Sequence, residues 1–397
     1  MAQLRTTNPL SPWIPAADLP NPTVCRPPVA RLTCGESKPT VLDFFAGSGL
    51  VSEALRPYFK SIWANDICEK KAKVFRANHP DTPLWPDSIE KVRGSQVPPA
   101  VLSWGSFPCQ DLSLAGNMGG ITSARSGLVW QWLRVMDEME TRPPIVVAEN
   151  VVGLIAAGAG AHYRSLHMAL VERGYRVGAV VLDSASWLPQ SRRRVFVIGI
   201  QRHLDPMEPA VGGPTWCHPS NLIRVVESLP HWAWWALPPP NTQPVPLEQL
   251  VDWNAPCDGP ERCSHNLDLV PERHRAMMEA SVAAGLRVFP GYKRRRKGCQ
   301  VLELRFDAIA GCLRTPEGGS SRQLLVLWRD GRFHTRLLTV RETARLMGAP
   351  DNYQLPGTYN DGYRAMGDAV ALPVARYLAH HLLTPLAVAV QGATKCR

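Results

Sequence analysis

Short apolar runs alternate with longer mixed segments through the first half of the chain. Four of these runs have the length of buried strands, at residues 41–44, 61–64, 100–104 and 145–148. Residues 50–58 can follow the first run as a helix. Strands that alternate with helices predict an α/β domain with a largely parallel sheet, in which ligands bind beyond the carboxyl ends of the strands.

The same pattern divides the chain into segments. Residues 1–38 are rich in proline and predict an irregular arm. We expect residues 39–200 to form the α/β domain. Between residues 201 and 335 the periodicity breaks, prolines and tryptophans cluster, and a smaller irregular domain is predicted. Helical character returns at 340–347, and residues 360–390 would complete the first domain, so the chain leaves this domain and comes back to it.

The turn after the first strand has the composition of a nucleotide-binding site. It contains Gly47 and Gly49, but Ser52 stands where a dinucleotide site would have a third glycine. The second strand ends in Asn65-Asp66, and an acid at that place can bind both hydroxyls of a ribose. The sequence therefore favours adenosine without a pyrophosphate over NAD.

Two dipeptides that follow later strands carry candidate chemistry. Pro108-Cys109 offers a thiol nucleophile and Glu149-Asn150 offers a carboxyl group. Both lie after apolar runs, so we expect them to face one crevice at the edge of the sheet. Cysteine is usually a small buried residue, so Pro108-Cys109 by itself fits a structural role as well as a catalytic one.

Together, these segments and four further motifs resemble the DNA (cytosine-5) methyltransferase family, which uses S-adenosylmethionine. The matching segments occur in the family's order at residues 43–49, 65–66, 87–89, 107–110, 149–151, 190–194, 336–348 and 367–370. The resemblance implies an α/β fold: a Rossmann-like S-adenosylmethionine-dependent methyltransferase domain with a smaller, irregular target recognition domain at residues 201–335. Residues 336–359 would link the recognition domain back to the catalytic domain.

The resemblance also implies a reaction, the transfer of a methyl group from S-adenosylmethionine to C5 of a flipped-out cytosine in a specific duplex DNA sequence. Cytosine C5 is a poor nucleophile, and addition of a thiolate to C6 turns the ring into an enamine that can attack the methyl group. Cys109 is the implied nucleophile, and Glu149 would donate a proton at N3. Arg194, with Arg192 beside it, would hold the base O2 and the acid.

The implied site residues fall into three groups. Those of catalysis are Cys109, Gln110, Glu149, Asn150, Arg192 and Arg194. Those of cofactor binding are Asp43, Phe45, Ala46, Gly47, Ser48, Gly49, Asp66, Ile67, Asp87, Ser88, Pro108, Asp368 and Ala369. Those of DNA binding are Lys293, Arg294, Arg295, Arg296, Lys297, Arg314, Ser320 and Arg322. At position 368 the family usually has Asn, and because an ionised Asp cannot donate a hydrogen bond, the contacts at that edge of the cofactor site should differ.

Two features of the central segment allow more than one interpretation. The run at residues 293–297 consists of five cations between two glycines. We expect it to be a loop that contacts phosphates, and a solvated loop is the alternative. Five residues raise the question of zinc, but they lack a tight Cys-Cys knuckle, so no metal site is expected. They are Cys217, His218, Cys257, Cys263 and His265.

Composition narrows the classes of partner. The net charge of +10 favours an anionic partner, and no apolar run is long enough to span a membrane. The expected partner is double-stranded DNA, with a companion restriction endonuclease as a second candidate, and we expect a monomer in the cytoplasm, associated with the nucleoid. Two alternatives stay open: the same chemistry on transfer RNA, and a non-catalytic DNA-binding module that keeps the fold.

Overall fold

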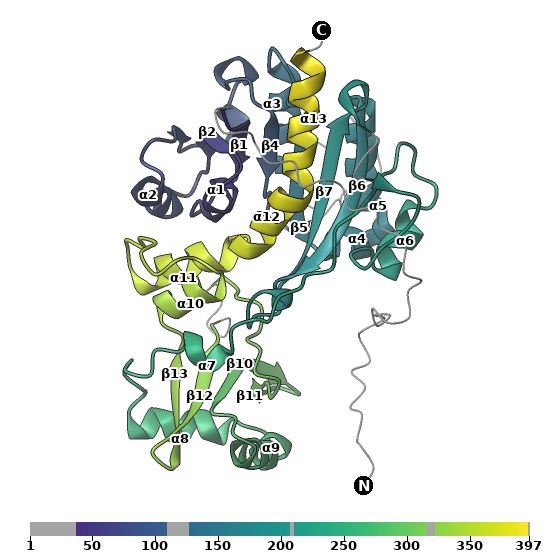
Figure 1. The fold of residues 1–397 in the computed structure, drawn as a ribbon. Helices are drawn as coiled ribbons and strands as arrows, with labels where there is room; N and C mark the ends of the chain where they lie inside the picture. Colours follow the sequence, from purple (N-terminus) through teal and green to yellow (C-terminus); the bar gives the residue numbers. More distant parts are fainter. Residues whose placement is uncertain (1–36, 109–126, 207–209, 316–321, 396–397) are drawn as a thin grey trace.

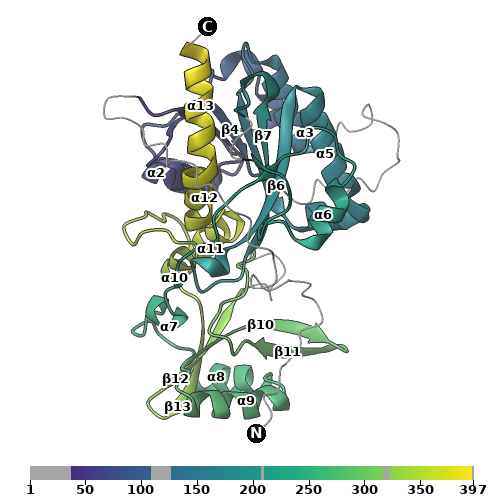
Figure 2. The ribbon, with the colours of Figure 1, turned by 45° about the vertical axis from the view of Figure 1, so that its right-hand side comes forward.

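The computed structural model describes residues 37–108, 127–206, 210–315 and 322–395. The helices and strands form two lobes, which Figures 1 and 2 show one above the other. We call residues 37–237 together with 340–395 the first lobe, and residues 247–337 the second lobe. The helices α10 (Val340–Leu346) and α11 (Tyr359–Asp368) lie where the two lobes meet.

The first lobe is built on a seven-stranded sheet with the order β3-β2-β1-β4-β5-β7-β6. Its strands are β1 (Thr40–Phe44), β2 (Lys60–Asn65), β3 (Leu84–Trp85), β4 (Leu102–Gly105), β5 (Ile145–Val151), β6 (Tyr175–Asp183) and β7 (Arg193–Gln201). Neighbouring strands are parallel except at β7, which is antiparallel to both β5 and β6. The strand order reverses between β1 and β4, so the loops that follow these two strands diverge and open a crevice at their carboxyl ends.

Helices cover both faces of this sheet, because its strands carry apolar side chains on both sides. One face packs against α1, α12 and α13, and the other against α3, α4 and α5. Within β1, Val41 belongs to the first cluster and Leu42 to the second, as the alternation of a strand requires. The helices of the lobe are α1 (Leu50–Leu55), α2 (Glu69–Asn78), α3 (Leu128–Glu138), α4 (Gly153–Ala156), α5 (Ala161–Glu172), α6 (Ser220–Val226), α10, α11, α12 (Leu372–Leu378) and α13 (Thr384–Lys395).

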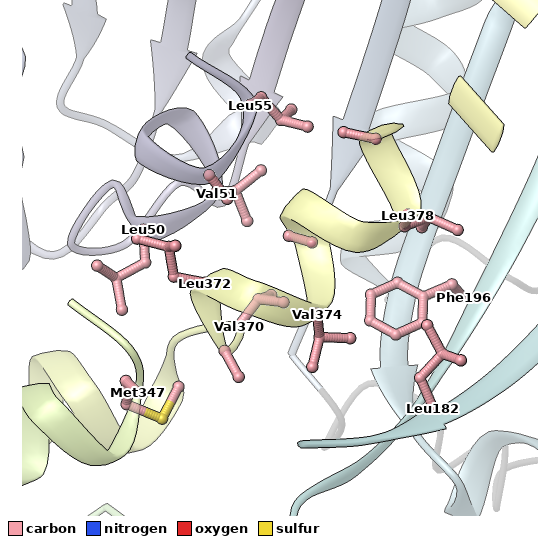
Figure 3. Close-up of a cluster of buried hydrophobic side chains, with 14 of the residues drawn as sticks. Leu50, Val51, Leu55, Leu182, Phe196, Met347, Val370, Leu372, Val374 and Leu378 are labelled. Atoms are coloured by element: carbon pink, nitrogen blue, oxygen red, sulfur yellow. The ribbon is translucent and has the colours of Figure 1, made fainter. Parts of the chain in front are cut away.

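The C-terminal helices complete the first lobe, as the sequence predicts for residues 360–390. Figure 3 shows α12 between α1 and strands β6 and β7, with Leu372 beside Leu50 and Leu378 beside Phe196. One turn of π-helix, Ala379–Leu383, joins α12 to α13. Both α10 and α11 begin with a capping box, in which the side chain of Thr339 or Thr358 accepts a hydrogen bond from the third residue of the helix.

The second lobe contains a regular antiparallel sheet with the order β11-β10-β12-β13, which differs from the irregular domain that we expected. Its elements are α7 (Leu247–Leu250), α8 (Pro260–Asp268), α9 (Glu272–Ala283), β10 (Val288–Arg296), β11 (Cys299–Leu304), β12 (Leu324–Arg329) and β13 (Arg332–Leu337). One sheet face packs Phe289 and Val326 into a cluster with residues of α8 and α9, whereas Val288 and Leu325 on the other face join the core of the first lobe.

The chain changes lobes later than residue 201. Strands β8 (Ala210–Val211) and β9 (Trp234–Trp235) pair with each other, and Ala233 and Val177 of β6 form a backbone hydrogen bond. Trp235 is fully buried in the core of the first lobe, and α6 packs there as well. The tryptophans that suggested the start of a second domain therefore belong to the first lobe.

Candidate active site

The loop after β1 and the end of β2 form a cradle around Asp66. The backbone N–H of Gly47 donates to Asp66 Oδ2 and that of Cys68 to Asp66 Oδ1, each over 2.8 Å. Gly49 has a φ of 84°, and a Cβ atom there would lie 2.6 Å from the ring of His79, so the turn requires glycine at this position. These contacts fix the carboxylate, and each of its oxygens keeps a lone pair for a ligand.

An exposed apolar side chain lies beside this carboxylate. Ile67 directly follows Asp66, and 68% of its surface is exposed. The Asn65 side chain donates to the backbone oxygens of Trp85 (3.1 Å) and Asp87 (2.7 Å), which holds the ends of β2 and β3 together. An apolar surface between two acids is suited to an aromatic base that carries a ribose.

Asp87 is held in its ionised form. Lys91 Nζ lies 3.0 Å from its Oδ2, and the backbone N–H of Ser88 donates to its Oδ1 over 2.7 Å. These hydrogen bonds lower the pKa of Asp87 below its ordinary value. Asp87 therefore offers a hydrogen-bond acceptor at neutral pH.

Asp43 is buried within β1, ahead of the loop that contains Gly47 and Gly49. Its Oδ2 accepts a hydrogen bond of 2.7 Å from Ser52, and its Oδ1 has no partner within the described ranges. Burial raises the pKa of Asp43 to about 7. The loop continues through Phe45, which has a positive φ of 57°, to Ala46, whose N–H donates to Asn65 O over 2.8 Å.

The C-terminal part of the chain closes the other side of this loop. Ser48 Oγ donates to the backbone oxygen of Ala365 over 3.1 Å. Asp368, where the family usually has Asn, forms an ion pair with Lys71 of α2. The side chain of Lys71 also lies against Gly47, with its Cδ 3.9 Å from the position of a Cβ there. The charge of Asp368 thus has a partner that the local sequence does not reveal.

A buried acid and a cation lie at the end of β5. Only 6% of Glu149 is exposed, and its Oε1 lies 3.1 Å from Nε of Arg194 on β7. In the antiparallel register Glu149 faces Phe196, two positions from Arg194, so the two side chains meet diagonally on one face. Burial raises the pKa of Glu149, although the charges of Arg194 and Arg192 and a hydrogen bond from Ser106 oppose the rise.

Asn150 connects this acid with the loop after β4. Its Nδ2 donates to the backbone oxygen of Phe107 over 2.9 Å, and its Oδ1 accepts from the N–H of Val151 over 2.8 Å. Phe107 is buried and Pro108 is exposed. Cys109 and Gln110 come next in the chain and lie outside the described residues. Asn150 thus fixes the backbone from which the predicted nucleophile follows.

The structure places Arg192 differently from the sequence expectation. Its guanidinium donates to three backbone oxygens, those of Leu313 (3.1 Å), Gly367 (2.9 Å) and Ala369 (2.7 Å), and it is almost fully buried. It is therefore committed to backbone carbonyls, and only Arg194 of the two pairs with Glu149. Burial lowers the pKa of the Arg192 guanidinium, and the neighbouring charge of Arg194 adds to this effect. Both charges oppose the rise in the pKa of Glu149.

Gln190 works with Arg192 at the same junction. Its Nε2 donates to the backbone oxygen of Leu346 over 2.6 Å, and its Oε1 accepts from the N–H of Leu313 over 3.0 Å. Gln190 and Arg192 of the Gln-x-Arg-x-Arg motif therefore hold together the chain segments at Leu313, Leu346 and Gly367. The last arginine of the motif, Arg194, pairs with Glu149.

The cationic run is a strand and a turn, not the loop that we expected. Lys293, Arg294, Arg295 and Arg296 end β10, which pairs with β11 as far as Arg296. Lys297, with a φ of 47°, lies in the turn to β11. Because strand side chains alternate, Arg294 and Arg296 lie on one face and Lys293 and Arg295 on the other.

The other predicted DNA-binding residues lie near the junction of the lobes. Arg314 is exposed, and its guanidinium lies 5.9 Å from the ring centroid of Tyr292. Arg322 donates to Asn360 Oδ1 over 2.7 Å, which ties it to α11. Ser320 is outside the described residues. Tyr292 is a residue that the sequence analysis did not single out, because its partners are distant in the chain.

In the described part of the chain, no group of three or more His, Cys, Asp or Glu side chains is arranged to hold a metal ion. No helix within those same ranges has the length and apolar character that a membrane span requires.

Comparisons with known proteins identify relatives of this arrangement. The type II methyltransferase M.MthTI of Methanothermobacter thermautotrophicus is 25% identical over 350 residues, which cover 85% of this chain and 95% of that protein. M.NgoFVII of Neisseria gonorrhoeae, also a type II methyltransferase, is 29% identical over 195 residues, and this match spans about half of each protein, 46% of this chain and 51% of the relative.

Solved structures share the fold at low sequence identity. The crystal structure of the S. pombe Dnmt2 methyltransferase superposes with a TM-score of 0.58 at 18% identity, covering 88% of this chain and 99% of that one. The Entamoeba histolytica methyltransferase EhMeth gives a TM-score of 0.59 at 14% identity, covering 88% and 99% of the two chains. The methyltransferase fold predicted from the sequence is thereby confirmed.

The family model described as C-5 cytosine-specific DNA methylase matches residues 40–243 and 293–384. These two ranges include the candidate site, the strands of all three sheets apart from the start of β10, and the helices α10, α11 and α12. Because the match covers well over half of the chain, the protein belongs to the C-5 cytosine-specific DNA methylase family.

Proposed function

We propose that the protein transfers the methyl group of S-adenosylmethionine to C5 of a cytosine in duplex DNA, as a modification enzyme that can accompany a restriction endonuclease. The family and the type II relatives support this proposal. The observation that carries it is the pair of Glu149 and Arg194 on the sheet edge where Asn150 fixes the backbone two residues before Cys109.

The cradle at the ends of β1, β2 and β3 has the groups that S-adenosylmethionine needs. Asp66 would accept hydrogen bonds from the ribose hydroxyls, and the exposed side chain of Ile67 would pack on the adenine. The ionised Asp87 would accept from the adenine edge. When bound, S-adenosylmethionine supplies an electrophilic methyl group.

The acid site fits the charge changes at the base. The Cys109 thiolate would form a bond to cytosine C6, and the electron pair displaced from the ring would be taken up by a proton from Glu149 at N3. Because its pKa is raised, Glu149 can hold that proton, while Arg194 orients the carboxyl group through Oε1. After methyl transfer, a base would take the C5 proton, the C5–C6 double bond would re-form, and the bond from C6 to the Cys109 sulfur would break, which releases the thiolate and restores the aromatic ring.

Expression in a host that lacks 5-methylcytosine, followed by sequencing for the modified base, would identify the target site. The covalent step is then tested with a duplex that carries 5-fluorocytosine at that site, because fluorine cannot be eliminated and the adduct persists in denaturant. We expect the adduct with the wild-type protein and not with Cys109→Ala. Cys299→Ala is a matched control, since Cys299 is an exposed free cysteine in the second lobe.

An adduct that persists in Cys109→Ala would mean that another residue is the nucleophile. Transfer RNA assayed in parallel separates the two substrates. Methylation of transfer RNA without methylation of DNA would replace the proposed substrate. Methylation of neither would contradict the proposed activity and favour a non-catalytic protein that keeps the fold.

A further inference from the structure

A basic cavity lies between the recognition sheet of the second lobe and the Gln-x-Arg-x-Arg motif. It has a volume of about 580 Å³ and reaches from Ser191 and Cys312 to the face of β10. Five of its lining residues are arginines: Arg273, Arg294, Arg296, Arg305 and Arg314. Such a surface fits a polyanion. The five arginines differ, however, in whether a carboxylate of the protein already pairs with them.

Two of these arginines are paired with carboxylates. Arg296 donates to both oxygens of Glu303, over 2.6 and 2.9 Å, and Arg305 forms an ion pair with Asp307. By contrast, neither Arg294 nor Arg314 forms an ion pair with a carboxylate within the described ranges, although the charge of Arg294 lowers the pKa of Glu303 after the larger effect of Arg296. These two lie over the ring of Tyr292, with guanidinium carbons 5.1 and 5.9 Å from its centroid.

The ring that carries these two guanidinium groups is fixed. Tyr292 is 8% exposed, and its hydroxyl donates to the backbone oxygen of Cys312 over 2.6 Å. A Cβ atom on Gly311 would come within 2.7 Å of the ring, so the neighbouring chain packs tightly against it. Contacts with this fixed ring thus limit where the guanidinium groups of Arg294 and Arg314 lie before DNA arrives.

The backbone of Arg314 is fixed by the catalytic motif. Gln190 binds the N–H of Leu313 and Arg192 binds its oxygen. The backbone oxygen of Arg314 packs on Gly367, where a Cβ would lie 2.9 Å away. The same motif that places Arg194 on Glu149 therefore places Arg314 on Tyr292.

We infer that Arg294 and Arg314 read guanine in the target sequence, each through the N–H fork that stacking on Tyr292 leaves free. The inference rests on the proposed function. Bidentate bonds from arginine to O6 and N7 of guanine are the commonest specific contact in the major groove. Contacts to phosphate tolerate flexible cations, whereas two guanidinium groups held over one fixed ring are suited to base edges.

Lysine at these positions keeps the charge and loses the planar fork, so Arg294→Lys and Arg314→Lys separate base reading from attraction to phosphates. Arg295→Lys is the matched control, because Arg295 is the neighbouring exposed arginine on the other face of β10. Each full-length protein would methylate a duplex library randomised around cytosine, and sequencing would give the context of each 5-methylcytosine.

We expect the wild-type context to contain guanine near the target, and each of the two variants to lose about tenfold or more of the preference at one guanine position. Arg295→Lys should keep the wild-type context. Tyr292→Phe, which retains the ring but loses the bond to Cys312, should weaken the same preference.

Three results would overturn the inference. They are a wild-type context without guanine, an unchanged guanine preference in Arg294→Lys and Arg314→Lys, and an equal loss of activity on all sequences, which would mean contacts to phosphate only. In all three the wild-type protein still makes 5-methylcytosine in DNA. Its failure to do so would instead contradict the proposed function.

Discussion

At the scale of single residues, burial changes which charges the molecule can hold. Asp43 and Asp87 are both acids at strand ends of the first sheet, yet their surroundings differ. Asp43 is buried with one unpartnered oxygen, whereas Asp87 is bound by Lys91. The pKa is raised to about 7 in Asp43 and lowered in Asp87.

These shifts predict opposite effects of pH on stability. The folded state holds the proton of Asp43 above the ordinary pKa of 3.8, so this group destabilises the fold increasingly as pH rises from about 4 to about 7. Asp43→Asn removes that dependence. The free energy of unfolding of the variant, relative to wild type, should rise by about 2 to 3 kcal/mol between pH 5 and pH 8.

Urea unfolding of both proteins across this pH range measures the difference. Asp87→Asn is the control, because the lowered pKa of Asp87 stabilises the fold at all pH values above the ordinary pKa of 3.8, and this contribution is lost only as pH falls below 3.8. The difference between Asp87→Asn and wild type should therefore stay constant between pH 5 and pH 8. If the difference in free energy of unfolding between Asp43→Asn and wild type did not change with pH, Asp43 would be ionised in the folded protein already at pH 5.

Local residue signals were sufficient where partners are close in sequence. The cradle of Asp66 is made by Gly47 and Cys68, and the glycine turn and the acid at the next strand end predict from the sequence that these groups lie together. The partners of Arg192 could not be read in this way, since its acceptors lie 121 to 177 residues further along the chain. Asp368 and Lys71 are separated in the same manner.

At the scale of elements, the motif of Gln190, Arg192 and Arg194 joins segments that no local pattern connects. Two of its side chains bind backbone groups of the 312–313 segment and the helices after it, and the third binds the acid. The motif was recognised from its sequence, but the division of work between its arginines depends on tertiary contacts.

This division predicts separable effects of two conservative changes. Arg192→Lys should lower the free energy of unfolding by about 2 to 4 kcal/mol, because one ammonium cannot serve three buried carbonyls in fixed positions. Arg194→Lys should leave stability nearly unchanged and lower the rate of methyl transfer about a hundredfold, because Glu149 loses its orienting partner. Urea unfolding and single-turnover assays of both variants test this prediction. If Arg192→Lys mainly lost rate and Arg194→Lys mainly lost stability, the two arginines would have the opposite roles.

The strand β10 shows why its conformation was mispredicted. Five adjacent cations are typical of a solvated loop, and their charge masked the alternation of a strand. Once β10 pairs with β11, the alternation brings Tyr292 and Arg294 to one face and Lys293 to the other. The cationic run at residues 293–296 therefore has two faces with different neighbours.

At the scale of the whole molecule, the chain passes from the first lobe to the second and back, and we propose that the first lobe carries the chemistry and the second the recognition of DNA sequence. Their junction contains a buried ion pair, in which Arg336 donates to both oxygens of Glu342 over 2.6 and 2.7 Å. Glu342 also accepts from the N–H of Asp252 over 2.8 Å. The order of catalytic segments was predictable from motifs, but the sheet of the second lobe was not, since its short strands pack mainly through distant partners.

This junction defines a chimera that tests where sequence choice resides. Exchanging residues 257–335 for the matching segment of a relative with another target leaves Asp252, Arg336 and Glu342 in place. We expect an active enzyme whose 5-methylcytosine appears in the relative's sequence context, because the exchanged segment carries β10 to β12 and Arg314. An active chimera that keeps the original context would place recognition in the first lobe.

The late position of α12 has a consequence for synthesis of the protein. The last strand of the first sheet ends at Gln201 and α12 begins at Leu372, so roughly 170 residues separate a complete sheet from the helix that covers it. At about 5 to 20 residues per second, ribosomes need roughly 10 to 35 s to make that stretch. We expect the apolar surface that α12 covers around Leu182 and Phe196, drawn in Figure 3, to stay incompletely covered on the nascent chain during this interval. We expect chaperones that bind exposed hydrophobic surface to bind the nascent chain in this interval, before α12 covers the sheet.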